Sequence, residues 1–382
     1  MVEPRTVARG RRAPPSGRPR EASLRPAAPV GSLAVVLRVA FDARDARDVR
    51  RRGWGRHAAD LLAALRRRDD VAVRACGPAG GGRLPEIAWE QLGWPARIAG
   101  DGADLLHQPN CFLPRYRPCP GVVTVHDLAF EVHPDDFARR TGWKYRTFTR
   151  RAVADAEAVI CVSRATADDV LERYGPEPAR VHVVPNGPSL AHGTRPAGIG
   201  PGLAPGDPDD DRPYVVAIGD LRAKKNLERL VAAWRRSGVA HRLLLVGTAG
   251  GAPGAEQELA ARLRAGGAEL CGWLEDDELD ALLRGADLLV HPSLFEGFGL
   301  VLLEAMARGV PVACSDIPSL RETAGGAAEL FDPRDVDDLA RAITDALARR
   351  DALARAGRAR AAAFGWERAA EETVAVYRSV AP

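Results

Sequence analysis

The stretch ADLLVHPSLFEGFGLVLLEAMARGVPVACSD, residues 286–316, contains the elements that indicate the fold. A continuous apolar run at 286–293 predicts a buried strand, the glycine-rich LFEGFG predicts a loop, and LVLLEAMAR predicts a helix. Gly309 is a typical C-terminal cap for that helix, and the run at 310–316 predicts a second strand. A strand, a helix and another strand in this order are typical of a parallel sheet with helices on both faces.

The same alternation recurs through most of the chain. Further strand-like runs, separated by helical patterns, lie at 33–43, 103–108, 121–127, 158–163, 181–187, 214–220, 241–247, 268–273 and 327–333. Residues 188–212 have neither period and are rich in Gly, Pro and Asp, which is typical of a linker. We therefore predict an α/β protein with two doubly wound parallel-sheet domains, 33–187 and 213–365, and a ligand cleft between them.

Composition excludes several classes of protein. The 382 residues are 46% hydrophobic and 27% charged, as in globular proteins. A net charge of +3 is too small for a nucleic-acid-binding face, so no nucleic-acid partner is expected. No apolar run reaches the ~18–20 residues of a membrane span, and the Arg- and Pro-rich residues 1–32 lack the apolar core of a secretory signal. We expect a disordered arm there and a cytoplasmic protein. The six cysteines form no CxxC pair and are better explained as buried thiols.

Two glutamates stand where open parallel sheets bind ligands. Glu296 follows the strand at 286–293, in a loop whose Gly297 and Gly299 permit close backbone approach, and Glu304 lies about one turn into the next helix. For either glutamate alone, local capping or solvation is the better explanation. Both together, in an apolar and glycine-flanked segment, favour a binding site, because a buried charge needs a partner.

The segment AIGDLRAKKNLERL, 217–230, also runs from strand to loop to helix. Gly219 permits the turn, and Lys224 and Lys225 precede Asn226, which is a plausible N-cap. Only three of the 54 basic residues are lysine, so an adjacent pair is unusual in this chain. A lysine here can bind a phosphate, although a solvated pair at a helix start is an equally good interpretation.

The segment TVHDLAF, 124–130, places His126 and Asp127 at a strand end in the first half of the chain. A lone histidine is more often structural, and an aspartate can cap a loop, but the position favours a functional role. The segment RRGWGRH, 51–57, predicts a fourth loop of this kind. Its Gly-x-Gly is weak evidence because the GxGxxG spacing of a dinucleotide site is missing.

The segment FARRTGWKYRTFTRRAV, 137–153, mixes six cations with Phe137, Trp143, Tyr145 and Phe148. A helix of this composition can contact an anionic membrane surface peripherally. A solvated helix whose aromatic side chains pack inward is the favoured alternative.

Together these motifs resemble the group 1, or family 4, glycosyltransferases over about Val36–Ala381. The resemblance is carried by ADLLHQPN, VTVHDLAF, ICVSRATADDVLERYG, VHVVPNG, GDLRAKKNLERLVAAW and HPSLFEGFGLVLLEAMARGVPVACSDIPSLRET, in this order. WEQ at 89–91 and HDLAF look most like the mannosyl-type transferases of surface polysaccharide synthesis. The resemblance implies the GT-B fold of two Rossmann-like domains, with a C-terminal helix at 366–382 that crosses back onto the first.

The implied activity is retaining transfer of a hexose, mannose-type favoured, from a nucleoside-diphosphate sugar to a saccharide or lipid-linked acceptor, without metal or other cofactor. Glu296 would hold the donor sugar near its reacting carbon, and His126 would contact donor sugar or acceptor from the first domain. Glu304 would bind the ribose hydroxyls, and Lys225, with Lys224 beside it, would bind the diphosphate. The expected donor-binding set is completed by Gly297, Phe298, Gly299, Leu300, Gly219, Gly53, Gly55 and Asp127.

Asp220 departs from the family pattern, since many relatives carry Arg immediately after this glycine. An acid would repel a diphosphate, so either Asp220 turns away or Arg222 or Lys224 supplies the missing charge. Two alternative functions stay open, a nucleotide-sugar epimerase of the same fold and a catalytically inactive nucleotide-sugar-binding module. An NAD-dependent oxidoreductase is disfavoured by the missing GxGxxG spacing.

Overall fold

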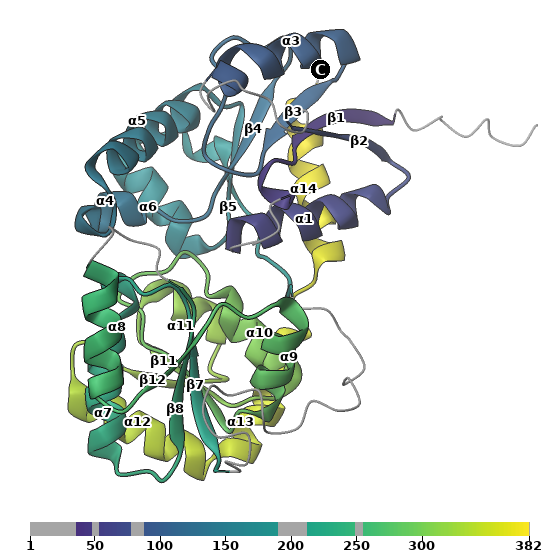
Figure 1. Ribbon diagram of the computed structural model, residues 1–382. Coiled ribbons are helices and arrows are strands. Elements are labelled where there is room, and N and C mark those ends of the chain that lie inside the picture. The colour runs from purple at the N-terminus through teal and green to yellow at the C-terminus, as the bar shows by residue number, and fades with distance from the viewer. Residues whose placement is uncertain (1–35, 48–52, 78–87, 190–211, 249–254, 382) are drawn as a thin grey trace, which may run out of the picture. The chain divides into compact units, whose positions relative to one another are not determined.

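A computed structural model describes residues 36–47, 53–77, 88–189, 212–248 and 255–381 (Figure 1). The predicted arm at 1–32 and nearly all of the predicted linker at 188–212 lie outside the described residues. Within the described residues, the strands form two six-stranded parallel sheets. No helix in this part of the chain is long and apolar enough to cross a membrane.

The first sheet has the strand order β2-β1-β3-β4-β5-β6. Its strands are β1 (Leu37–Asp42), β2 (Val71–Cys76), β3 (Leu105–Gln108), β4 (Gly121–Val125), β5 (Ala158–Cys161) and β6 (Val181–Val183). Five of them lie inside the predicted apolar runs. The edge strand β2 is additional, because its partly exposed VAVRAC sequence is no continuous apolar run.

Helices cover both faces of this sheet. One face packs against α1 (Gly53–Arg66) and α14 (Trp366–Val380), which lie beside each other in Figure 1. The other packs against α3 (Trp94–Asp101), α5 (Arg139–Asp155) and α6 (Arg164–Tyr174). Short helical turns lie at Asp45–Arg47, Trp89–Gly93, Ala129–Val132 (α4), Pro134–Asp136 and Pro178–Arg180. Apolar strands with both faces covered are what the continuous runs predict.

The second sheet has the order β12-β11-β10-β7-β8-β9. Its strands are β7 (Tyr214–Ile218), β8 (Arg242–Val246), β9 (Glu269–Gly272), β10 (Leu288–His291), β11 (Val312–Ser315) and β12 (Glu329–Phe331). One face packs against α9 (Asp276–Gly285), α10 (Leu300–Arg308), α11 (Pro318–Ala324) and the end of α13 (Arg350–Ala361). The other packs against α7 (Leu227–Ser237), α8 (Ala255–Ala265) and α12 (Val336–Ala348). The predicted class, doubly wound parallel α/β, is confirmed.

One local prediction is wrong, and a second is confirmed only in part. A loop was expected at 51–57, but α1 begins at Gly53 and the segment is helical from there onward. Trp54 packs against His126, with ring centroids 5.8 Å apart, and this tertiary contact outweighs the low helix propensity of the flanking glycines. Asn226 occupies the predicted N-cap position of α7, but its side chain makes no capping hydrogen bond. Its backbone is left-handed, with φ 55°, and its amide donates to the carbonyl of Pro333.

Candidate functional site

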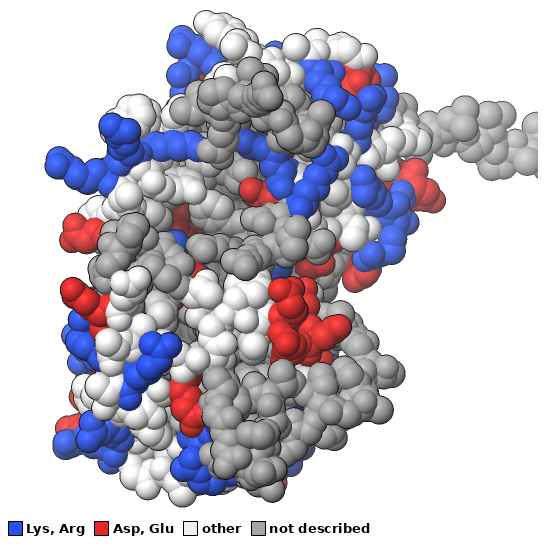
Figure 2. Space-filling model, in the orientation of Figure 1, with Lys and Arg blue, Asp and Glu red and all other residues white. Residues whose placement is uncertain are grey.

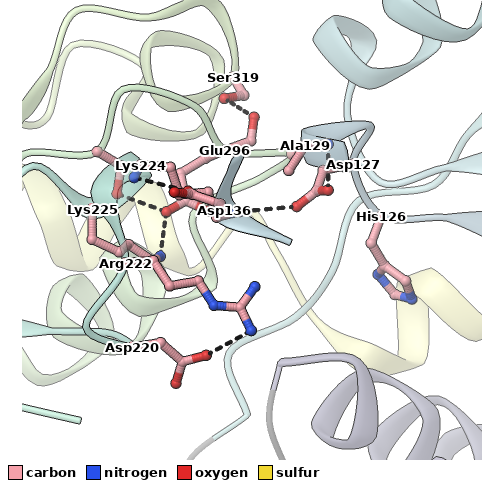
Figure 3. A network of polar contacts seen from close by, with 12 residues as sticks. His126, Asp127, Ala129, Asp136, Asp220, Arg222, Lys224, Lys225, Glu296 and Ser319 are labelled. Carbon is pink, nitrogen blue, oxygen red and sulfur yellow. Dashed lines mark hydrogen bonds and ion pairs between the residues drawn. The ribbon is translucent and has the colours of Figure 1, made fainter. Parts of the chain in front are cut away.

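The carboxyl ends of β7 and β10, which are paired neighbours, bring Lys225 and Glu296 together (Figure 3). One carboxylate oxygen of Glu296 accepts hydrogen bonds from Lys225 Nζ at 2.5 Å and from Ser293 Oγ at 2.7 Å. The same oxygen lies 3.0 Å from His291 Nε2. The first of the two glutamates therefore has a charged partner as well as neutral donors.

Glu296 is ionised at neutral pH. Burial raises the pKa of its carboxyl, but the charge of Lys225, the hydrogen bond with His291 and the charge of Lys224 together lower that pKa well below its ordinary value. Burial also lowers the pKa of His291, so a neutral imidazole donates from Nε2. A carboxylate held in this form stabilises a neighbouring positive charge and is unsuited to donating a proton.

The second lysine contacts residues that follow a strand of the first sheet. Lys224 Nζ lies 3.4 Å from Asp127 Oδ2, and its backbone N–H donates to Asp136 at 2.9 Å. Lys224 is buried, which lowers the pKa of its amine, but Asp127 and Glu296 more than offset this and raise it. Each lysine therefore faces a carboxylate, which an anionic ligand would have to replace as partner.

His126 is neutral and its ring stands apart from the Lys225–Glu296 pair in Figure 3. Its Nε2 lies 2.8 Å from the carbonyl of Pro109 and donates to it, which leaves Nδ1 as the acceptor nitrogen. Burial lowers the pKa of the ring, although the bond to Pro109 and the charge of Asp127 act in the opposite direction. The structure therefore brings Asp127, but not the imidazole of His126, into the polar network.

Glu304 is buried in α10 opposite Arg56 of α1. Its Oε1 lies 3.9 Å from Arg56 Nη1, and neither atom has a hydrogen-bond partner within the described residues. Burial raises the pKa of the Glu304 carboxyl to about 7, and the charges of Arg56 and Arg308 offset this only in part. Arg56 also pairs with Asp276 at the start of α9. A buried acceptor without a donor costs free energy, which a ligand hydroxyl would recover.

We call Glu296–Leu300 the glycine loop. An added Cβ at Gly297 would lie 1.6 Å from the carbonyl oxygen of His126, so the chain's own packing excludes any side chain there. Gly299 has φ +87°, in the left-handed region that favours glycine, and Leu300 then begins α10. Both glycines are therefore required for a reason besides ligand approach.

The remaining predicted positions are explained by local contacts. A Cβ at Gly219 would lie 3.1 Å from Lys225 Cε, so glycine makes room for the lysine side chain. Asp220 Oδ2 lies 3.7 Å from Arg222 Nη2, and the same guanidinium lies over the ring of Phe137. The acid that departs from the family pattern therefore has a cationic neighbour (Figure 3).

The predicted contacts with donor and acceptor are not tested by this arrangement and stay predictions. Gly53 and Gly55 lie in the first turn of α1, and their approach to a diphosphate stays a prediction, as does the role of Phe298. The described residues contain no group of three or more His, Cys, Asp or Glu that could hold a metal ion. The independence from metals likewise stays a prediction. None of the six cysteines, all of which are described, forms a disulfide.

Sequence reasoning missed His291 and Ser293, which contact the Glu296 carboxylate, and Asp136, which accepts from the backbone of Lys224. It also missed five further residues that contact Glu304 or the glycine loop. Arg56 lies in the segment RRGWGRH, 51–57, and a cation beside two glycines could have been recognised from the sequence as a candidate binding residue. The other four carry hydroxyls that contact carbonyls of the glycine loop, and they are Ser163, Thr166, Ser319 and Thr323. Single Ser and Thr residues on two different helices carry no sequence signal for such a role.

Comparisons with known proteins give matches in both halves of the chain. Residues 204–362 match the family model "Glycosyl transferases group 1", and residues 51–192 match "Glycosyltransferase Family 4". O-antigen chain mannosyltransferase B of Escherichia coli is 29% identical over 72% of this chain and 74% of its own length. Alpha-maltose-1-phosphate synthase of Mycolicibacterium smegmatis is 33% identical over 75% of this chain and 77% of its own length. Sucrose-phosphate synthase of Thermosynechococcus elongatus superposes with a TM-score of 0.69 at 22% identity, covering 90% of this chain and 98% of that one.

Proposed function

The chain belongs to the group 1 glycosyltransferases, enzymes that use nucleotide sugars, and from this premise we propose that it transfers a hexose to a saccharide or lipid-linked acceptor with retention of configuration. The observation that carries the proposal is the contact between Lys225 and the ionised Glu296 at adjacent strand ends. A fixed negative charge and a fixed positive charge side by side suit a donor that develops a cationic sugar and an anionic leaving group.

Glu296 acts on the sugar. Its carboxylate, held by Lys225, Ser293 and His291, lies beside the reacting carbon and stabilises the positive charge that develops as the glycosidic bond to the phosphate breaks. Its depressed pKa suits this role, because the carboxyl is charged throughout the neutral range. Fixed charges that need no reorganisation during the reaction stabilise the transition state more than the ground state.

The lysines and the glycine loop act on the diphosphate. Lys225 exchanges part of its contact with Glu296 for a phosphate oxygen, and the backbone of Gly297, Phe298 and Gly299 offers N–H groups at the start of α10. We favour front-side displacement, in which the leaving phosphate oxygen accepts the proton of the acceptor hydroxyl. No metal is needed because the cations and the helix start carry the charge of the leaving group.

Glu304 acts on the ribose. Its partnerless Oε1, buried beside Arg56, is an acceptor for a ribose hydroxyl. Glu296 and Glu304 then mark two ends of one ligand, sugar at the loop and ribose in the helix. The mannose-type donor is proposed on the sequence likeness to an O-antigen chain mannosyltransferase.

A lipid-linked acceptor would involve peripheral contact with an anionic membrane, for which α5 is the candidate. Tyr145 stacks inward on Phe112 and Phe130, so the aromatic side of the helix is largely packed, as favoured from the sequence. Trp143 is 60% exposed, and Figure 2 shows Lys and Arg side chains over the part of the molecule where α5 lies. Sedimentation with vesicles containing anionic lipid, with Trp143→Ala as the comparison, tests this contact.

The function is tested by incubation with UDP- and GDP-sugars and a panel of acceptors, with and without EDTA. We expect a retained glycoside product that Glu296→Ala and Lys225→Ala reduce strongly, and undiminished transfer by both variants would contradict the residue assignment. Conversion of the donor to its isomer without acceptor would instead identify an epimerase. Binding of UDP or GDP by calorimetry with no product from any donor would identify an inactive binding module.

A further inference from the structure

Three consecutive carbonyl groups of the glycine loop each accept a hydrogen bond from a side-chain hydroxyl. The carbonyl of Glu296 accepts from Ser319 Oγ at 2.6 Å, as Figure 3 shows, and that of Phe298 accepts from Thr323 Oγ1 at 2.5 Å. The carbonyl of Gly297 lies between these two and is bonded by Ser163 Oγ at 2.5 Å and Thr166 Oγ1 at 3.0 Å. We call these four residues the hydroxyl clamp.

The clamp determines where the loop's N–H groups point. In a trans peptide the C=O of one residue and the N–H of the next point in opposite directions. Carbonyls directed at α6 and α11 therefore turn the N–H groups of Gly297, Phe298 and Gly299 away from these helices. In the part of the chain that the structure describes, none of these three N–H groups donates a hydrogen bond. Successive unpaired N–H groups form a concave site for an anion.

The two helices that carry the clamp are themselves held in place. The carboxylate of Glu322 in α11 accepts from the backbone N–H of Arg164 at 2.9 Å and of Ala165 at 3.1 Å, at the start of α6. Arg360 donates to the carbonyls of Glu322 at 2.7 Å and Thr323 at 2.9 Å. These hydrogen bonds fix α6 and α11 in place, so the hydroxyls of the clamp can hold the loop in one orientation.

We propose that the hydroxyl clamp positions the glycine loop for catalysis, by keeping its carbonyl dipoles off the donor's diphosphate and presenting its N–H groups to it. The inference rests on the proposed function, because it assigns the anion to the nucleotide sugar. Ser319 and Thr323 are positioning residues, since their hydroxyls act on the donor through the loop carbonyls that they bond. Without the clamp, a rotated peptide would direct a carbonyl oxygen at a phosphate oxygen, and the two would repel each other.

The decisive experiment distinguishes the effect of the Thr323 hydroxyl on nucleotide binding from the effect of the side chain's volume. Thr323→Val keeps the shape and removes the hydroxyl, whereas Thr323→Ser keeps the hydroxyl and removes a methyl group. We expect affinity for UDP or GDP, measured by calorimetry, to weaken about two- to tenfold in the valine variant, as for the loss of one hydrogen bond, and to be restored in the serine variant. Normal affinity in the valine variant with weakened affinity in the serine variant would show a packing role and overturn the proposal.

A second comparison shows whether the effect concerns phosphate. UMP and GMP lack the outer phosphate, so the valine variant should lose much less affinity for them than for UDP and GDP. An equal loss for mono- and diphosphates would indicate general damage and contradict the clamp. The matched control is Thr373→Val in α14, where a buried hydroxyl without a hydrogen-bond partner in the described residues is removed. Ser319→Ala provides the same measurement if Thr323→Val does not fold.

The clamp and the proposed function can fail separately. If the wild-type protein binds UDP or GDP but transfers no sugar, the transferase assignment fails while the clamp is still tested by binding. If the wild type transfers sugar and Thr323→Val and Ser319→Ala both match it in donor KM and diphosphate affinity, the clamp is refuted and the transferase assignment stands.

Discussion

Glu304 should make nucleotide binding depend on pH, because burial raises the pKa of its carboxyl to about 7 in the free protein. A hydrogen bond from a ribose hydroxyl to the charged carboxylate is stronger than one to a protonated carboxyl, whose acceptor oxygen is neutral. Binding therefore favours the ionised form and lowers the pKa. About a tenth of the protein is ionised at pH 6 and about nine-tenths at pH 8, so UDP or GDP should bind more weakly at pH 6, by up to about tenfold.

The assay is calorimetry at pH 6, 7 and 8 in buffers of different ionisation enthalpy. At pH 7, binding should release up to about half a proton, because roughly half of the free protein carries the proton on Glu304. Glu304→Gln is the control, since it removes the titration but leaves that of the nucleotide phosphate. Identical pH dependence in the wild type and Glu304→Gln would refute the reasoning.

The same shift has a consequence for stability of the opposite sign. A carboxyl whose folded-state pKa is raised from 4.5 to about 7 makes the ligand-free protein less stable as pH rises through that window, by roughly 3 kcal/mol in total, and the loss is complete above pH 7. Glu304→Gln should therefore raise the melting temperature of the free protein at pH 8 while weakening nucleotide binding. Arg56 keeps Asp276 as its partner in this variant. A lowered melting temperature at pH 8 would contradict the assigned cost of the buried charge.

Three further outcomes are expected. Gly297→Ala should reduce transfer sharply, because its Cβ would meet the His126 carbonyl at 1.6 Å, whereas Gly100→Ala, with nothing within 4 Å, should leave the rate unchanged; equal rates in both would contradict the close contact. Lys225→Met should raise the pKa of Glu296, because the charge of Lys225 lowers it in the wild type, and should move the acid limb of the pH–rate profile to higher pH. An acid limb at the same pH in both proteins would show that Glu296 is not the group that titrates there. Removal of divalent metals with EDTA should leave the wild-type rate unchanged, and restoration of a lost rate by added Mg²⁺ or Mn²⁺ would disprove metal independence.

Most strands could be predicted because a strand buried on both faces needs a continuous apolar run, and such runs are local in the sequence. The edge strand β2 could not, since an edge position leaves part of its surface exposed. The start of α1 was mispredicted for a related reason: the contact of Trp54 with His126 makes a Gly-x-Gly segment helical, and no local pattern contains that contact.

The candidate site divides in the same way. Glu296 and Lys225 stand out by residue type in loops that follow strands, and Glu304 stands out in the helix after the glycine loop. The structure brings Glu296 and Lys225 into contact as neighbours across β7 and β10. For the departure at Asp220 the sequence left several explanations open, Arg222 among them. The structure places the Arg222 guanidinium beside Asp220 and over the ring of Phe137.

The amino-acid sequence by itself determined the alternation of buried strands and helices, the glycines at the loop and the spacing of Glu296 and Glu304 on one strand–loop–helix unit. Only the tertiary structure decided that Arg56 faces Glu304, that Gly297 adjoins the carbonyl of His126, and that Ser163, 134 positions away, bonds the glycine loop. The physical reason is the separation along the chain over which each effect acts. Apolar periodicity and turn chemistry act within a few residues. Burial and the hydrogen bonds between distant segments depend on which parts of the chain the fold brings together.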